Sequence, residues 1–359
     1  LEAAGSALAA RGDALELTRR AAEQYLRSGH IDDGMATLRR VLDTVGIWLP
    51  KSPYASLASM LYRRALLRVR GLGYKARAAS EISAEELLRL DVTLSTSVGL
   101  GTVDTIRGAD FQARSLWLAL KAGEESRIAR SLGMEAGHVS AAGYGNEARV
   151  AKLVEASMGL AEKLGDPHAL GIAHACAGIT AFLFGHWRRG AESCERGLAI
   201  FRDQCSGVQW EMTNTSLFHL WALTYLGELK RMKAIITKLI QEAEEYGNRY
   251  AATNLRTGSL NFIWLMGDDV ELARREARVA IETWTQEGFH HQHWDDLLAQ
   301  GEIDLYGGDA AGCYERVHKT WPALRRSLLL EIQLSRIEAV HLRGRAAVAL
   351  AATLPADGR

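Results

Sequence analysis

The stretch FLFGHWRRGAESCERGLAIF, from Phe182 to Phe201, guides the interpretation of the whole chain. Within it, Gly185 is followed by Trp187 and then by small residues at Gly190 and Gly197. Glycine often ends a helix, and small residues let two helices approach closely. The pattern therefore predicts the turn and the second helix of an antiparallel helical hairpin.

The same turn recurs along the chain, each time as a large apolar residue followed by glycine. The five copies are Tyr144-Gly145, Phe184-Gly185, Leu226-Gly227, Met266-Gly267 and Tyr306-Gly307. Successive glycines are 40, 42, 40 and 40 residues apart. Apolar residues recur at helical spacing on both sides of each glycine, and sustained alternation of β-branched residues is absent from the sequence. We expect an all-α fold, a right-handed α-solenoid of helical hairpins with a repeat of about 40 residues.

The first part of the chain repeats less regularly. Five helices are expected there, over Leu15–Ser28, Asp32–Val45, Pro53–Arg70, Ala84–Gly99 and Asp104–Ala122. Two of the predicted helix starts, Ser52-Pro53 and Asp166-Pro167, combine an N-cap residue with proline at the first helical position.

The predicted organisation is one continuous solenoid, itself a fragment of a longer protein. We assign residues 1–122 to irregular helical repeats and residues 123–327 to regular hairpins. Residues 328–352 would form a C-terminal capping helix, and residues 353–359 a disordered tail. The stretch Pro322 to Ala352 reads either as one long helix or as a final hairpin.

Composition, net charge and cysteine spacing limit the classes of function expected for the chain. The chain has 359 residues, 48% of them hydrophobic and 24% charged, as in a folded soluble protein. Its formal net charge of zero gives no electrostatic reason to expect nucleic acid or a membrane as partner. The four cysteines have no paired spacing, which favours a reduced, cytoplasmic protein.

Counting residues back from the turn glycine of each hairpin identifies equivalent positions in successive hairpins, and these positions predict a binding groove. First helices of such hairpins line the concave face of a solenoid. Seven residues at matching offsets, or close to them, are predicted to form one patch: Asn214, Trp221, Asn254, Thr257, Asn261, Trp264 and Trp294. Asparagine can hold a peptide backbone and tryptophan can anchor an apolar side chain. The alternative is that the tryptophans pack the hairpins and the asparagines are merely solvated.

The repeat resembles the tetratricopeptide type. Four segments are similar to the C-terminal region of large bacterial serine/threonine protein kinases: Asp104–Gln112, Ile128–His138, Tyr250–Arg256 and Trp321–Leu328. In that family a kinase domain and a P-loop ATPase module precede the helical repeats. The resemblance implies a regulatory segment of a signalling protein whose ATP-binding and catalytic parts lie upstream.

Enzymatic chemistry is not predicted for the chain itself. The sequence contains no kinase catalytic loop, no Walker A motif and no nucleophile elbow. The histidines of His290-His291-Gln-His293 point in different directions on a helix, so a helix start is favoured over a metal site. No metal and no cofactor are expected. Some tetratricopeptide domains clamp a C-terminal carboxylate with a lysine where this chain has Thr257, which argues against acidic tails as ligands.

Three functions remain open at this point. The first is a non-catalytic protein-interaction module that binds a peptide, a protein or an upstream kinase or ATPase domain of the same chain. The second is a small-molecule sensor, as in repeat arrays of nucleotide-binding transcription activators. The third is an oligomerisation scaffold through the helix at Leu328 to Leu350. The oligomeric state is left open.

Overall fold

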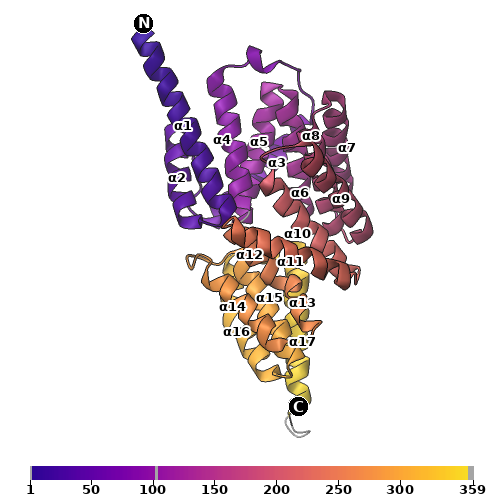
Figure 1. The fold of residues 1–359 in the computed structure, drawn as a ribbon. Helices are drawn as coiled ribbons and strands as arrows, with labels where there is room; N and C mark the ends of the chain where they lie inside the picture. The colour runs from indigo at the N-terminus through magenta and orange to yellow at the C-terminus, as the bar shows by residue number, and fades with distance from the viewer. Residues whose placement is uncertain (1, 102–103, 355–359) are drawn as a thin grey trace. The chain divides into compact units, whose positions relative to one another are not determined.

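The computed structural model describes residues 2–101 and 104–354 (Figure 1). Every regular element in these residues is a helix, so the all-α prediction is confirmed. The chain divides into two compact units, residues 1–131 and residues 132–359, which we call unit 1 and unit 2. The division falls inside one helix, α6, and each unit is described by itself.

Unit 1 contains five complete α-helices and the start of a sixth. They are α1 (Glu2–Ser28), α2 (Ile31–Thr44), α3 (Pro53–Arg70), α4 (Ala84–Gly101), α5 (Thr105–Ala122) and α6 (Glu125–Ser140), with a short 3-10 turn η1 (Ala79–Glu81). The predicted helices lie within one or two residues of these bounds, except that α1 begins well before Leu15. Residues 102 and 103 lie outside the described part of the chain.

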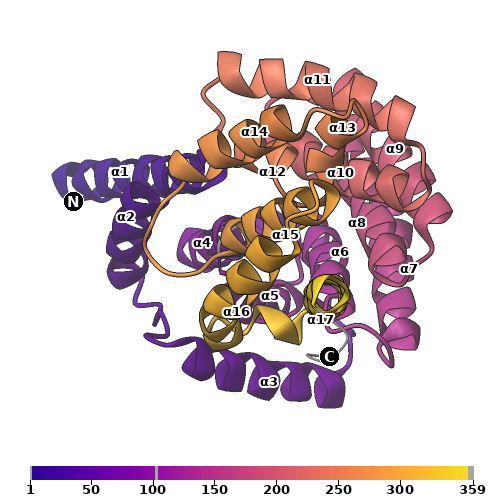
Figure 2. The ribbon, with the colours of Figure 1, turned by 90° about the horizontal axis from the view of Figure 1, so that it is seen from below.

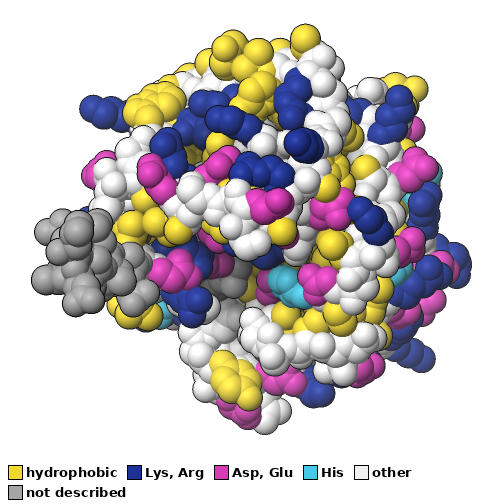
Figure 3. Space-filling view, turned by 90° about the horizontal axis from the view of Figure 1, so that it is seen from above, with side chains coloured by type: hydrophobic (Ala, Val, Ile, Leu, Met, Phe, Trp, Pro, Cys, Tyr) yellow, Lys and Arg dark blue, Asp and Glu magenta, His cyan; other side chains and the backbone are white. Residues whose placement is uncertain are grey.

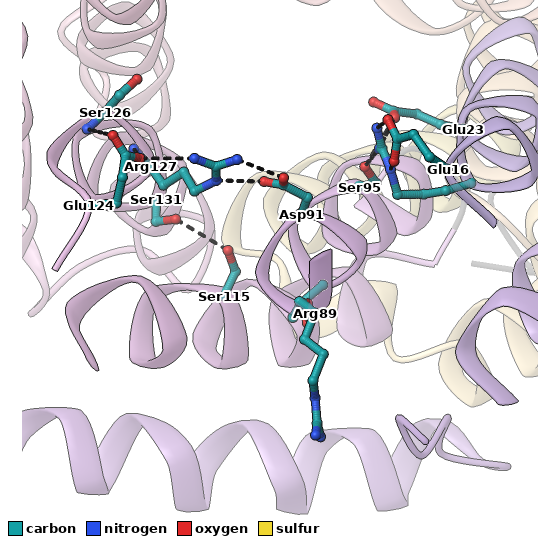
Figure 4. A network of polar contacts seen from close by, with 12 residues as sticks. Glu16, Glu23, Arg89, Asp91, Ser95, Ser115, Glu124, Ser126, Arg127 and Ser131 are labelled. Carbon is teal, nitrogen blue, oxygen red and sulfur yellow. Dashed lines mark hydrogen bonds and ion pairs between the residues drawn. The ribbon is translucent and has the colours of Figure 1, made fainter. Parts of the chain in front are cut away.

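Helices α4 and α5 form the centre of unit 1, and nearly every side chain in the second half of α4 is buried. Polar contacts tie the surrounding helices to this pair (Figure 4). Arg127 of α6 donates two hydrogen bonds of 2.7 Å to the Asp91 carboxylate of α4. Arg19 of α1 donates to Glu23 at 2.8 Å and also contacts Ser95 of α4. These charge-assisted contacts fix the packing of α1 and α6 against α4.

Unit 2 continues with antiparallel helices joined by short turns. They are α7 (Glu147–Leu164), α8 (Pro167–Leu183), α9 (Trp187–Gln204), α10 (Gln209–Tyr225), α11 (Leu229–Glu245), α12 (Arg249–Arg256), η2 (Gly258–Asn261), α13 (Phe262–Leu265), α14 (Val270–Glu282), α15 (His291–Tyr306), α16 (Ala310–Arg326), η3 (Leu329–Glu331) and α17 (Gln333–Thr353). Neighbours in sequence pack together, as do α8 with α10 and α15 with α17. The predicted caps Ser52 and Asp166 both accept backbone hydrogen bonds at their helix starts.

Each of the five turns predicted from the sequence contains a residue in the left-handed conformation. In three of them it is the predicted glycine: Gly145, Gly185 and Gly227. In the last two it is the following residue, Asp268 or Gly308. Gly267 and Gly307 therefore lie in the turns, but the residue after each of them adopts the left-handed conformation.

Helices α8 and α9 approach closely at glycines, as the opening stretch predicts. A methyl group on Gly190 would lie 3.1 Å from the backbone nitrogen of Phe182, and one on Gly197 would lie 3.1 Å from that of Ala175. On the facing helix, a methyl group on Gly178 would lie 2.9 Å from the nitrogen of Cys194. A side chain at Gly178 would force the two backbones apart, and one at Gly190 or Gly197 would make an unusually tight contact.

The C-terminal stretch is a hairpin, not one long helix. Pro322 lies inside α16, and the chain then reverses at Leu328, whose φ of 63° is left-handed. Figure 2 shows α17 nearly end-on beside α15 and α16. Trp294, Leu324 and Leu342 belong to the core that joins these three helices. The predicted tail beyond Leu354 lies outside the described residues.

Candidate ligand-binding site

One stripe of α10 carries an asparagine and three aromatic side chains. Asn214, Phe218, Trp221 and Tyr225 are spaced four, three and four residues apart, so they share one stripe of the helix. All four are half-buried. The stripe is therefore partly accessible along its length.

The aromatic members of this stripe form a cluster with two rings from the preceding hairpin. Trp221 stacks on Phe182 with ring centroids 6.3 Å apart, and Tyr225 stacks on Trp187 at 4.8 Å. Phe218 meets Trp221 edge to face at 4.9 Å. Phe182 is buried and Trp187 is half-buried. We call Phe182, Trp187, Phe218, Trp221 and Tyr225 the aromatic cluster.

A carboxylate from α17 reaches the end of this cluster. The hydroxyl of Tyr225 donates a 2.8 Å hydrogen bond to Oε1 of Glu338. Burial raises the pKa of Glu338 to about 7, although the hydrogen bond from Tyr225 favours the ionised form. The nearby carboxylates of Asp295 and Glu302 raise it further. Glu338 is thus poised to ionise close to neutral pH.

A second buried acid, Asp295 of α15, lies beside a break in the neighbouring helix. Burial raises the pKa of Asp295, and His291 lowers it. The break follows α12, where Thr257 is extended and Gly258 has a φ of 59°. A methyl group on Gly258 would lie 3.2 Å from Oδ1 of Asp295, so a side chain at this position would crowd the carboxylate.

Asn261 holds the broken helix together. Its amide donates to the carbonyl of Arg256 at 2.9 Å and to that of Ala273 at 3.0 Å. These bonds satisfy carbonyls that a continuous helix or a turn would otherwise have to satisfy. The side chain of Asn261 is 1% exposed, so its role in this structure is internal.

The structure separates the seven predicted groove residues into two sets. Asn254, Thr257, Asn261 and Trp294 are buried, with exposed fractions of 1 to 3%. Asn254 and Thr257 bond to carbonyls one turn earlier in their own segment, those of Tyr250 and Thr253. These four therefore do not line an exposed surface here, and a ligand-binding role for them remains a prediction.

The other three predicted residues are half-buried: Asn214, Trp221 and Trp264. Asn214 accepts a 2.9 Å hydrogen bond from Tyr250, and Trp221 belongs to the aromatic cluster. Along the unbroken α10, the offsets from the turn glycine place Asn214 and Trp221 on one stripe of the helix. In the next hairpin the helix is interrupted at Thr257, so the same offsets no longer fix which face a residue occupies.

Sequence reasoning missed Phe182, Phe218, Tyr225, Glu338 and Asp295. Phe218 and Tyr225 could have been found by following the helical spacing from Asn214 and Trp221. Glu338 could not, because its contact with Tyr225 joins residues 113 positions apart.

The histidines at the start of α15 have a structural role: His293 Nδ1 accepts a 2.9 Å hydrogen bond from the backbone amide of His290. In the described part of the chain, no group of three or more potential ligands could hold a metal ion.

A pocket lies on the opposite side of α10. It is formed by α10, α11 and α12 and contains about 540 Å³ of empty space, part of it open to solvent. Met212, Leu217, Leu239 and Leu255 supply apolar walls, and Glu242 also lines it. On the face of the molecule drawn in Figure 3, basic and acidic side chains are interspersed.

Comparisons with known proteins assign the chain to no family. No family model matches the chain, and a search of curated proteins finds no match. Within the described residues, no helix combines the length and the apolar character needed to cross a membrane.

Proposed function

We propose that the chain belongs to a right-handed α-solenoid of tetratricopeptide-like hairpins with a repeat of about 40 residues. The left-handed turn residues of unit 2, at positions 145, 185, 227, 268 and 308, support this period. Close glycine packing between α8 and α9 supports the hairpin type. Unit 1 would be the less regular beginning of the same array.

The function we propose is a non-catalytic protein-interaction and regulatory module. The supporting observation is the aromatic cluster along one stripe of α10, where Phe218, Trp221 and Tyr225 are half-buried and Tyr225 bonds to a carboxylate from α17. Rigid aromatic rings provide large contact area at little cost in side-chain entropy, and they dominate binding energy at interfaces. The ligand would be a peptide or a segment of a neighbouring domain. Following the resemblance noted above, the module would regulate a bacterial signalling kinase with an upstream ATPase.

Selection from a random peptide library with the full chain tests this function. We expect enriched peptides with the wild type and loss of that enrichment with Trp221→Ala. Tyr144→Ala is the matched control, because Tyr144 is aromatic but 86% exposed and lies outside the cluster. Enrichment that is absent, or equal with both variants, would contradict the proposal.

The pocket between α10, α11 and α12 favours one other function, a small-molecule sensor. Its mixed apolar and polar lining is of the kind that holds a metabolite. Thermal unfolding against a metabolite library would detect such a ligand, because only binding to the folded state raises the midpoint. Thr213→Phe, which would fill the pocket, should abolish the shift. A shift that survives this change would exclude the pocket as the site.

A further inference from the structure

We propose that the aromatic cluster and Glu338 recognise a positively charged side chain, an alkylammonium or a guanidinium, on the bound peptide. This inference rests on the proposed interaction function and specifies the chemistry of its ligand. It follows from two features of the site: the partners of its carboxylate and the arrangement of its rings.

Two buried carboxylates in the described part of the chain, those of Asp110 and Asp304, are closely paired with arginine. Asp110 is fully buried, and its carboxylate lies 2.5 Å from the Arg114 guanidinium. Asp304 is 1% exposed and contacts Arg274 at 2.8 Å and Arg316 at 2.9 Å. Pairing of this kind offsets the cost of removing a charge from water.

Glu338 is surrounded differently. The groups that act on it are a phenol, Tyr225, an indole, Trp294, and two further acids, Asp295 and Glu302. The phenol donates a hydrogen bond without bringing a positive charge. The hydrogen-bond partner of Glu338 at 2.8 Å is thus a neutral phenol, whereas Asp110 and Asp304 each contact a guanidinium. A cation supplied by a ligand would provide the missing charge.

The rings beside Glu338 suit such a cation. An aromatic face is negative, and it attracts ammonium and guanidinium groups within about 6 Å of its centre. Tyr225 joins the two features, since it stacks on Trp187 and bonds to Glu338. Trp221 and Phe218 continue the ring surface along α10 and are half-buried, so part of each remains accessible. A carboxylate at one end of a row of rings matches a charged group on an apolar stem.

Recognition of a cation also predicts a pH dependence. A bound cation favours ionised Glu338, so binding near neutral pH should release a proton and strengthen as the pH rises from about 6 to about 8. The titratable groups that act on Glu338 are Tyr225 from α10 and Asp295 and Glu302 from α15. Glu302 is itself paired with Arg345 of α17 at 2.5 Å. His291 acts on this group through Asp295.

The test compares two pools of random nonapeptides that are identical except at the central residue. One pool carries arginine and the other carries citrulline, its uncharged isostere. Binding to the full chain is measured by fluorescence anisotropy. We expect the arginine pool to bind about tenfold more tightly, and Glu338→Gln to remove both this preference and the pH dependence. Trp221→Leu should weaken the arginine pool, and Tyr144→Ala should leave it unchanged.

Equal binding of the two pools to the wild type would overturn the inference and leave the interaction function standing. A preference for arginine that persists in Glu338→Gln would also overturn it. Binding of neither pool, together with no enrichment from the random library, would contradict the interaction function itself. The comparison of pools needs only the wild-type chain, so it does not depend on the folding of any variant.

Discussion

At the scale of single residues, the ion pair between Asp110 and Arg114 contributes strongly to the stability of unit 1. Asp110 also accepts a 2.7 Å hydrogen bond from Ser59, and Arg114 donates to the carbonyl of Trp48 at 2.7 Å. The pair thus joins α3, α5 and the segment before α3. Removing Arg114 would leave the buried charge of Asp110 with only Ser59 and the more distant Arg63, at 3.9 Å, as partners.

We predict that Arg114→Met lowers the free energy of unfolding of unit 1 by about 3 kcal/mol, which urea unfolding followed by circular dichroism would measure. Arg20→Met is the matched control. Arg20 also contacts a carboxylate, that of Glu16 at 2.7 Å, but its side chain is 67% exposed. The control should change stability by less than about 0.5 kcal/mol. Equal effects of the two substitutions would contradict the importance of the buried pair.

Close packing of α8 on α9 makes a second prediction at this scale. Gly178→Ala should destabilise unit 2 by about 1–3 kcal/mol, because the new methyl group would meet the backbone of α9. Gly159→Ala in α7 has no atom within 4 Å of the new methyl group. It should stabilise the chain by about 0.5 kcal/mol through helix propensity. Thermal unfolding of both variants measures these changes in stability. A midpoint for Gly178→Ala equal to that of the wild type would exclude the close approach of α8 and α9.

Among the elements, the interrupted helix α12–η2–α13 departs most from the sequence pattern. Gly258→Ala should cost more than about 1 kcal/mol, since its φ of 59° disfavours any side chain and the methyl group would crowd Asp295. Gly308→Ala separates the two causes, because Gly308 is also left-handed but has open space around it. Equal losses measured by urea unfolding would show that crowding against Asp295 contributes nothing.

The sequence was sufficient for the helices and most of their turns, because these depend on local features. The caps at Ser52 and Asp166, the turn glycines and the apolar spacing act within a few residues. The break at Thr257 could not be predicted, because its stabilising contacts come from Asn261 to Ala273 and from the neighbouring α15. Long-range packing overrides local helix propensity there.

The candidate site was predictable only in part, for the same reason. The stripe on α10 follows from helical periodicity, and Asn214 and Trp221 lie on it. The carboxylate that completes it comes from α17, and helix spacing gives no information about which distant helix packs across the stripe. Asn254 and Trp294 were predicted from the same offset to the turn glycine as Asn214, yet their burial is decided by tertiary contacts.

At the scale of the whole molecule, Glu338 should make stability depend on pH. Its pKa is about 7 in the folded chain and 4.5 for the unperturbed group, so the folded state binds more protons between these values. Stability contributed by Glu338 is therefore present at low pH and is lost as the pH rises through this window. Glu338→Gln does not titrate.

We predict that Glu338→Gln gains stability relative to the wild type as the pH rises from about 5 to about 8. Urea unfolding at each pH measures the difference. His293, whose pKa is lowered to about 4 mainly by burial, acts in the opposite direction. The pKa of Asp296 is raised to about 6, mainly by burial, so Asp296 changes stability with pH in the same direction as Glu338. Both groups are present in each protein, so their effects cancel in the comparison. A constant difference would show that Glu338 is not held in its protonated form.

The proposed interaction surface is tested most directly by hydrogen–deuterium exchange of the full chain with and without the most strongly enriched peptide. The account predicts slower exchange on binding in α10, around Asn214 to Tyr225, and in α17, around Glu338. Slower exchange confined to other helices, with α10 and α17 unchanged, would contradict the placement of the ligand on the aromatic cluster.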